Sequence, residues 1–143
     1  MEERDLSRPW FPAPFRVAVL ESDETLADTL CGLLREKGLA PAAFYEIGSL
    51  VSAHGQKPFD AYVLDYLAAW QPESPALEAL VASIRGADLN VPLFILGNQA
   101  HPETNEKLGN ILMRFKVRYV LKPYRAVYLA REIAEAIAVR AGL

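Results

Sequence analysis

The chain has 143 residues and a formal net charge of −3, with 52% hydrophobic and 23% charged residues. These values are typical of one soluble globular domain with a full hydrophobic core. No apolar run approaches the roughly 20 residues that a membrane span needs, and the acidic start of the chain does not resemble a secretory signal. The absence of a long basic stretch argues against direct nucleic-acid binding by this domain.

Cys31 is the only cysteine, so neither an internal disulfide nor a cysteine-based metal cluster can form. It lies in an apolar helical pattern, which favours a small buried side chain over a reactive thiol. From this cysteine usage we expect a cytoplasmic protein.

Proline and aromatic residues dominate the first 15 residues. Pro9, Pro12 and Pro14 resist both helix and central strand. We therefore expect an irregular arm over residues 1–15, followed by a single domain over residues 16–143.

In the first half of the domain, residues 16–20 (RVAVL) predict a strand, and a helical pattern of leucines then runs to a stop at Gly38. Residues 42–45 predict a second strand. Gly48 and Ser49 predict the cap of a short helix over residues 50–54. Residues 60–64 (DAYVL) predict a third strand that ends at Asp65.

In the second half, Ser74 and Pro75 predict the start of a helix with apolar residues as far as Ile84. A fourth strand follows over residues 91–96, and a helix over residues 103–115. Residues 117–121 predict the fifth strand, and residues 126–139 the last helix.

The alternation of strands and helices defines the fold class. Strands separated by helices at this spacing pair in parallel through right-handed crossovers. The strands are continuous apolar runs, which is typical of a sheet covered by helices on both faces. The sequence therefore predicts an α/β fold with a doubly wound, five-stranded parallel sheet.

Polar residues follow the predicted strands, at the edge where open parallel sheets bind ligands. They are Glu21, Ser22 and Asp23 after the first strand, Asp65 after the third, Gly97 and Asn98 after the fourth, and Lys122 and Pro123 after the fifth. A buried carboxylate needs a cation or hydrogen bonds. Asp65 alone could cap a helix or pair with Lys122, but the cluster as a whole favours an oxygen-lined Mg²⁺ site.

Three of these anchors resemble the receiver domains of bacterial two-component response regulators. They are the acidic end of strand one (VLESDE), the YVLD that ends at Asp65, and the YVLKP that contains Lys122. The match runs from about residue 16 to residue 139. Tyr119 matches the family's aromatic switch position, and the Lys122–Pro123 peptide is often cis in such domains. The resemblance implies the flavodoxin-like receiver (βα)5 fold.

By this resemblance, Asp65 accepts a phosphoryl group from a sensor histidine kinase or a phosphotransfer protein. Mg²⁺ would be held by Glu21, Asp65 and the backbone carbonyl of Leu67, with Ser22 at the second acidic position. Lys122 would pair with the phosphoryl oxygens. The resemblance also implies a regulated output domain or target protein, a homodimer through the final helices, and no enzyme activity.

Two positions depart from the family's pattern. Ser22 replaces an acid and brings no charge, so the affinity for Mg²⁺ should fall. Gly97 replaces a Thr or Ser whose hydroxyl bonds the phosphoryl group, although a glycine there could simply serve a tight turn. The usual coupling of that hydroxyl to Tyr119 would be absent or rebuilt with Asn98 or Gln99.

Two functional hypotheses stay open. In the first, phosphorylation changes the surface formed by the fourth helix, fifth strand and fifth helix. In the second, the chain is a pseudo-receiver, a protein-interaction or dimerisation module that works without phosphorylation. The acidic, lysine and tyrosine anchors favour the first hypothesis, and Ser22 and Gly97 favour the second. An enzyme on a flavodoxin-like sheet is disfavoured, because neither GxGxxG nor GxxxxGK[ST] occurs.

Overall fold

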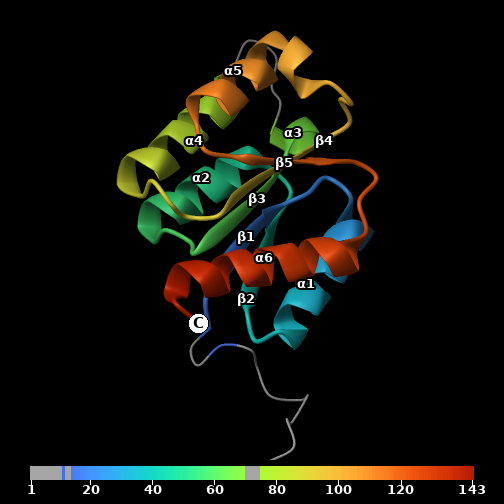
Figure 1. Cartoon of the computed structure of the whole chain (residues 1–143), viewed down its shortest axis with the longest axis vertical. Helices are drawn as coiled ribbons and strands as arrows, with labels where there is room; N and C mark the ends of the chain where they lie inside the picture. Colours follow the sequence, from blue (N-terminus) through green and yellow to red (C-terminus); the bar gives the residue numbers. More distant parts are fainter. Residues whose placement is uncertain (1–10, 12–13, 70–74) are drawn as a thin grey trace, which may run out of the picture.

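The computed structural model describes residue 11, residues 14–69 and residues 75–143 (Figure 1). Five strands form one parallel sheet in the order β2-β1-β3-β4-β5. The strands are β1 (Arg16–Leu20), β2 (Ala40–Phe44), β3 (Ala61–Asp65), β4 (Leu93–Gly97) and β5 (Arg118–Leu121). The predicted doubly wound, five-stranded parallel sheet is confirmed.

Helices cover both faces of the sheet (Figure 1). They are α1 (Glu24–Glu36), α2 (Ile47–Gln56), α3 (Tyr66–Ala69), α4 (Ala76–Ala87), the 3-10 turn η1 (Pro102–Thr104), α5 (Glu106–Arg114) and α6 (Ala126–Ala141). α1 and α6 pack on one face, and α2, α4 and α5 pack on the other. Among the helices that the structure describes, none combines the length and apolar character needed to span a membrane.

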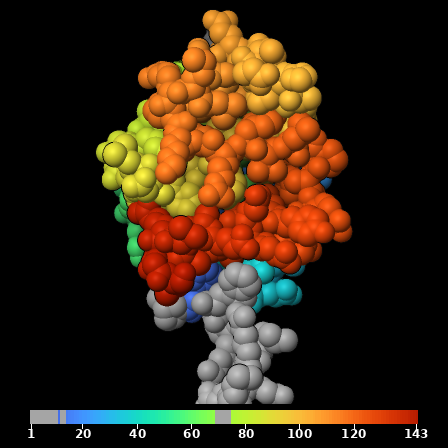
Figure 2. Space-filling model, viewed as in Figure 1, coloured from blue at the N-terminus to red at the C-terminus, as the bar shows by residue number. Residues whose placement is uncertain are grey.

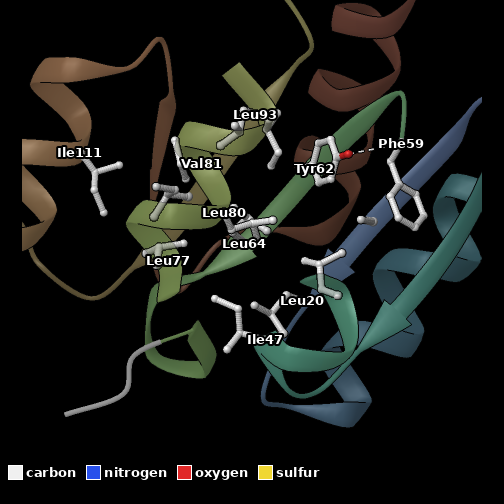
Figure 3. Packing of buried hydrophobic residues seen from close by; sticks show 14 of the residues in the cluster. Leu20, Ile47, Phe59, Tyr62, Leu64, Leu77, Leu80, Val81, Leu93 and Ile111 are labelled. Atoms are coloured by element: carbon white, nitrogen blue, oxygen red, sulfur yellow. Dashed lines mark hydrogen bonds between the residues drawn. The ribbon is translucent and has the colours of Figure 1, made fainter. Parts of the chain in front are cut away.

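The core consists of two layers, one on each face of the sheet. In β1, Val17 and Val19 belong to the layer under α1 and α6, while Ala18 and Leu20 belong to the opposite layer. Figure 3 shows this second layer, in which Leu20 and Leu64 of the sheet lie among side chains of α2 and α4. Because both faces are covered, every residue of β3 and β4 is buried.

Several boundaries differ from those expected. α2 begins at Ile47, so the prediction that Gly48 and Ser49 cap it was wrong. The buried Ile47 side chain anchors the first turn in the core, and Glu46 precedes the helix without a side-chain cap. β2 begins at Ala40 because it pairs with β1 from that residue onward, and Pro41 is tolerated in this edge strand.

In the second half, β4 begins at Leu93 rather than at residue 91. α5 begins only at Glu106, because Asn105 caps it by accepting the backbone N–H of Leu108 at 3.0 Å. The short helix α3 was not expected. Ser74, predicted as a helix cap, lies outside the described residues, and α4 begins after Pro75.

The division into an arm over residues 1–15 and a domain over residues 16–143 stays a prediction, since most of the arm lies outside the described residues. Two of its aromatic residues can be placed. Phe11 is buried in the core layer under α1 and α6, and its ring packs edge-on against Phe15 with 5.5 Å between the ring centroids.

Candidate functional site

The carboxyl ends of three strands bring Glu21, Asp65 and Lys122 together. Glu21 directly follows β1, Asp65 is the last residue of β3, and Lys122 directly follows β5. Both carboxylate residues are fully buried. The strands are in parallel register, so residues that end them meet at one edge of the sheet, as the sequence predicted.

Lys122 bridges the two carboxylates. Its Nζ lies 2.9 Å from Oε1 of Glu21 and 3.2 Å from Oδ1 of Asp65. Burial lowers the pKa of the Lys122 ammonium, but the hydrogen bonds and charges of the two carboxylates outweigh burial and raise this pKa above its usual value. The lysine therefore stays charged at neutral pH. The Lys122–Pro123 peptide bond is cis, as expected.

The second oxygen of the Asp65 carboxylate is held by three donors. Oδ2 accepts the Ser22 hydroxyl at 2.9 Å, the backbone N–H of Ala68 at 3.3 Å and the backbone N–H of Ser22 at 3.4 Å. The Ala68 amide belongs to α3, so Asp65 both pairs with Lys122 and bonds the helix that follows it. Both structural interpretations of Asp65 are therefore correct, and neither occupies the whole carboxylate.

Glu21 is held by a residue that the sequence analysis missed. Its Oε2 accepts the Tyr124 hydroxyl at 3.3 Å, and its Oε1 accepts the backbone N–H of Asp23 at 3.2 Å as well as Lys122. Burial first, and then the Glu21 carboxylate, raise the pKa of Tyr124 well above its usual value. The sequence signal for this contact was the position of Tyr124 directly after the Lys-Pro pair.

A hollow of about 320 Å³ opens beside Asp65. Its lining residues are Asp65, Tyr66, Leu67, Gly97, Asn98, Gln99 and Asn105. A second hollow of about 350 Å³ is lined by Asn98 and Lys122, among others. The structure thus brings the predicted residues Leu67, Gly97 and Asn98 to the same edge of the sheet as Asp65.

Among the comparisons with known proteins, solved structures match this architecture. No family model and no curated protein matches the chain. A receiver domain protein (CheY-like) from Methanospirillum hungatei JF-1 has a TM-score of 0.70 at 15% identity, covering 91% of this chain and 98% of that one. An orphan response regulator of H. pylori has a TM-score of 0.68 at 15% identity, with 88% and 99% covered. The BeF3-activated DrrB receiver domain has a TM-score of 0.66 at 17% identity, with 87% and 97% covered.

This chain has the receiver fold. Within that fold, Tyr119 packs closely against Gly97. A Cβ atom at Gly97 would lie only 2.6 Å from the Tyr119 hydroxyl oxygen and 3.0 Å from Oε1 of Gln99. The Tyr119 hydroxyl donates to the backbone carbonyl of Gln99 at 2.8 Å. Tyr119 therefore occupies the volume that a side chain at position 97 would need.

The alternative of a tight turn at Gly97 was wrong. The described glycines with a positive φ are Gly38 and Gly142, so Gly97 does not use the backbone freedom of glycine. The physical reason for the glycine is instead the close approach of Tyr119. The structure couples Tyr119 to Gln99, one of the two residues that the sequence analysis offered for this coupling.

The donor set of this receiver fold fits a weakly held Mg²⁺. Glu21 and Asp65 carry two negative charges, Lys122 returns one positive charge, and Ser22 adds a neutral hydroxyl. Over the described ranges there is no group of three or more His, Cys, Asp or Glu that could hold a metal. Mg²⁺ often binds through one or two carboxylates together with waters and substrate phosphates. The site therefore suits an ion that arrives with a phosphate better than a resident metal.

Proposed function

We propose that this chain is a non-enzymatic, cytoplasmic signalling domain that accepts a phosphoryl group on Asp65 from a sensor histidine kinase or a phosphotransfer protein. One observation carries the proposal. Lys122 contacts both Glu21 and Asp65 at the carboxyl edge of a receiver fold, and Asp65 also lines a hollow of about 320 Å³. An aspartate with a fixed ammonium beside it is suited to receiving an anionic group.

The two oxygens of the Asp65 carboxylate accept hydrogen bonds from different donors. Oδ2 is held by Ser22 and Ala68, whereas within the described residues Oδ1 accepts only from Lys122. Oδ1 is therefore the freer oxygen to attack phosphorus. As the new P–O bond forms, the P–N bond to the donor imidazole breaks, and its electron pair stays on the imidazole nitrogen. Lys122 then pairs with the phosphoryl oxygens.

Mg²⁺ would be held by Glu21, Asp65 and the backbone carbonyl of Leu67. When bound, the ion offsets the repulsion between the anionic carboxylate and the anionic phosphate. Ser22 supplies a neutral hydroxyl instead of a third carboxylate. We therefore expect the site to have a low affinity for Mg²⁺.

The proposed output is a change in the surface of α5, β5 and α6. β5 connects the site around Asp65 with the proposed output surface, because Tyr119 lies within the strand and Lys122 directly follows it. A phosphoryl group that draws Lys122 from the two carboxylates onto its own oxygens would act on this strand and shift the population of two surface states. An output domain or target protein reads this surface, and a homodimer through the final helices is part of the proposal.

The first test uses Mg²⁺ and beryllofluoride, a mimic of the acyl phosphate, with backbone amide NMR as the measurement. We expect Mg²⁺-dependent shifts around Asp65, Gly97 and Tyr119. The matched control is Asp65→Asn, which keeps the side-chain shape and should remove the response. Unchanged spectra at high concentrations of both ions would refute phosphorylation at Asp65.

A second candidate is the pseudo-receiver, and the packing of Tyr119 favours it. Tyr119 packs against Gly97, and its hydroxyl donates to the backbone carbonyl of Gln99. A surface already fixed in this way could bind a partner constitutively. The pseudo-receiver predicts no beryllofluoride response, and a partner affinity that is the same for the natural chain and for Asp65→Asn.

A further inference from the structure

A separate hollow lies at the amino ends of β4 and β5, at the end of the sheet opposite to Asp65. Its volume is about 580 Å³, and its lining includes Leu93 and Arg118, the first residues of these two strands. At about 3.3 Å per residue, β4 separates this hollow from Gly97 by roughly 13 Å. The yellow α4–β4 segment, the orange β5 region and the red α6 that surround it meet on the face in Figure 2.

Positive charge gathers around this hollow, in a chain whose net charge is −3. The cationic lining residues are Arg85, Lys116, Arg118 and Arg140. Glu135 is the one acidic residue in the lining. Arg140 is paired with Asp88 of the α4–β4 connection, which still leaves three cations against Glu135. The local field therefore favours an anion.

Arg85 forms a buried positive charge next to the hollow. The residue is only 7% exposed, and its guanidinium donates to the carbonyls of Lys116 and Asp88, both at 3.2 Å, and of Val91 at 2.8 Å. In the described part of the chain no carboxylate lies within ion-pair distance of it. Carbonyl dipoles and the more distant Asp88 carboxylate compensate this charge, and an anion placed nearby would gain a further favourable interaction.

Lys116 and Arg118 supply the contacts that an anion needs. Both are exposed, and neither takes part in an ion pair within the described ranges. The Arg118 guanidinium lies 5.5 Å from the ring centroid of Phe94. A guanidinium can bind a carboxylate or phosphate through two parallel hydrogen bonds, and a neighbouring ammonium adds a point charge.

Apart from Asn90, the remaining wall is apolar. Val91, Val117 and Val139 all line the hollow, and Val139 is 79% exposed. An inorganic ion would leave this surface in contact with water. A ligand that combines an acid group with an apolar body would cover it and gain the free energy of apolar burial.

We propose that this hollow binds a small organic anion, in which a phosphate or carboxylate group is attached to an apolar body. The acid group contacts Lys116 and Arg118, and the apolar body packs on Val117 and Val139. The volume of about 580 Å³ suits such a ligand, because small-molecule sites range from roughly 300 to 1,000 Å³. The site does not involve Asp65 and does not depend on the function proposed above.

The test is a backbone NMR titration of the full chain with phenyl phosphate and, separately, with benzoate. We expect saturable shifts of the amides of Val91, Val117 and Val139 with at least one of these probes, and the comparison tells a phosphate from a carboxylate ligand. Inorganic phosphate lacks the apolar body and phenol lacks the acid group, so we expect each to bind about tenfold more weakly than phenyl phosphate. Equal binding of inorganic phosphate would overturn the role of the apolar wall.

Charge-neutral variants locate the site. Arg118→Gln and Lys116→Gln should each weaken binding about tenfold, the effect of one lost charged hydrogen bond. Glu135→Gln should strengthen it. Lys107→Gln is the matched control, because Lys107 is an exposed lysine on α5 outside the lining. Equal weakening by Lys107→Gln would overturn the proposal in favour of a general charge effect.

Asp65→Asn separates this proposal from the proposed function. Binding of phenyl phosphate at the hollow should be unchanged in this variant. Stronger or weaker binding in this variant would show that the probe occupies the carboxyl edge of the sheet, and would overturn the second site. A failed beryllofluoride test, in contrast, leaves the hollow and its titration unaffected.

Discussion

A side chain at position 97 would need the small volume that the Tyr119 hydroxyl occupies. A methyl group at position 97 would lie 2.6 Å from the hydroxyl oxygen, closer than van der Waals contact allows. We expect Gly97→Ala to displace Tyr119 from the carbonyl of Gln99 and to lower the free energy of unfolding by about 1–3 kcal/mol. Urea denaturation measures the loss, and a crystal structure of the variant shows where the ring moves.

A double-mutant cycle isolates this clash. Tyr119→Phe removes the oxygen that the new methyl group would meet first, while keeping the ring. Gly97→Ala should therefore cost less in the Tyr119→Phe background, with a coupling of at least about 0.5 kcal/mol. Equal costs in the two backgrounds would show that the Tyr119 hydroxyl does not restrict position 97.

Under the function proposed above, Ser22 lowers the affinity of the site for Mg²⁺. Its hydroxyl donates to Oδ2 of Asp65 at 2.9 Å and adds no charge. Ser22→Asp would add a third carboxylate, so we expect the affinity for Mg²⁺ to rise about tenfold. Without metal, repulsion from Asp65 should lower the free energy of unfolding by about 1–2 kcal/mol. Isothermal titration calorimetry and urea denaturation measure the two effects.

The control for this prediction is Ser22→Ala, which removes the same hydroxyl without adding a carboxylate. Its affinity for Mg²⁺ should not rise. A similar rise in both variants would mean that loss of the hydrogen bond to Asp65, rather than the added charge, controls the metal affinity.

Residue patterns predicted whether most segments form a helix or a strand. The residues at which each element begins and ends depended on contacts that the patterns do not contain. β1 was predicted with its observed bounds, because its apolar run coincides with the residues buried between two helical layers. β2 starts two residues before the expected position because its pairing partner is Arg16 of β1. α3 was missed because four residues are too few to show a helical period.

α2 is joined to β3 and α4 by a partly buried hydrogen-bond chain through His54. Nδ1 of His54 lies 2.5 Å from the Tyr62 hydroxyl, which accepts the backbone N–H of Phe59 at 2.9 Å (Figure 3). The hydroxyl proton is therefore free to be donated to Nδ1. Nε2 then carries the ring proton and donates it to the Ser83 hydroxyl at 3.3 Å. Donation from Tyr62 to Nδ1 places His54 in the neutral form with the proton on Nε2.

Acid should therefore weaken the attachment of α2. Burial lowers the pKa of His54 below its ordinary value of 6.5, so the folded state binds fewer protons than the unfolded state as pH falls below that value. The free energy of unfolding should then fall with pH, from about 6.5 down to the folded-state pKa, by at most about 1.4 kcal/mol per pH unit. Urea denaturation between pH 7 and pH 5 measures this slope.

Two variants assign the slope to His54. His54→Gln should flatten it in this pH range, at some cost in stability at neutral pH. His101→Gln removes the exposed histidine next to η1 and should keep the slope of the natural chain. An unchanged slope in His54→Gln would show that other groups control the acid response.

For the molecule as a whole, the sequence predicted which strand ends converge but not how the loops close over them. Glu21, Asp65 and Lys122 could be placed together because parallel strands share one carboxyl edge. The contact of Tyr124 with Glu21 and the position of Tyr119 over Gly97 depend on loop and side-chain directions that no periodicity records. The cationic hollow was missed for a similar reason, since its residues come from α4, β4, β5, α6 and the segments that lead into β4 and β5.

Lys122 links the first, third and fifth strands, through partners that lie 101 and 57 positions away in the sequence. Lys122→Met would leave Glu21 and Asp65 buried without their shared cation. We expect the free energy of unfolding to fall by about 3–5 kcal/mol, as is typical when one member of a buried ion pair is removed. Urea denaturation at neutral pH gives this value.

A charge-free variant measures how much of this loss comes from the unpaired carboxylates. Glu21→Gln, Asp65→Asn and Lys122→Met combined leave no charge in the cluster and similar side-chain volumes. If unpaired carboxylates cause the loss, this triple variant should be more stable than Lys122→Met alone, even though it carries two further substitutions. If the triple variant is instead less stable than Lys122→Met, the hydrogen bonds that the two carboxylates accept from Tyr124, Ser22 and Ala68 contribute more than the relief of their unpaired charge, and this edge of the sheet tolerates two adjacent carboxylates without a cation.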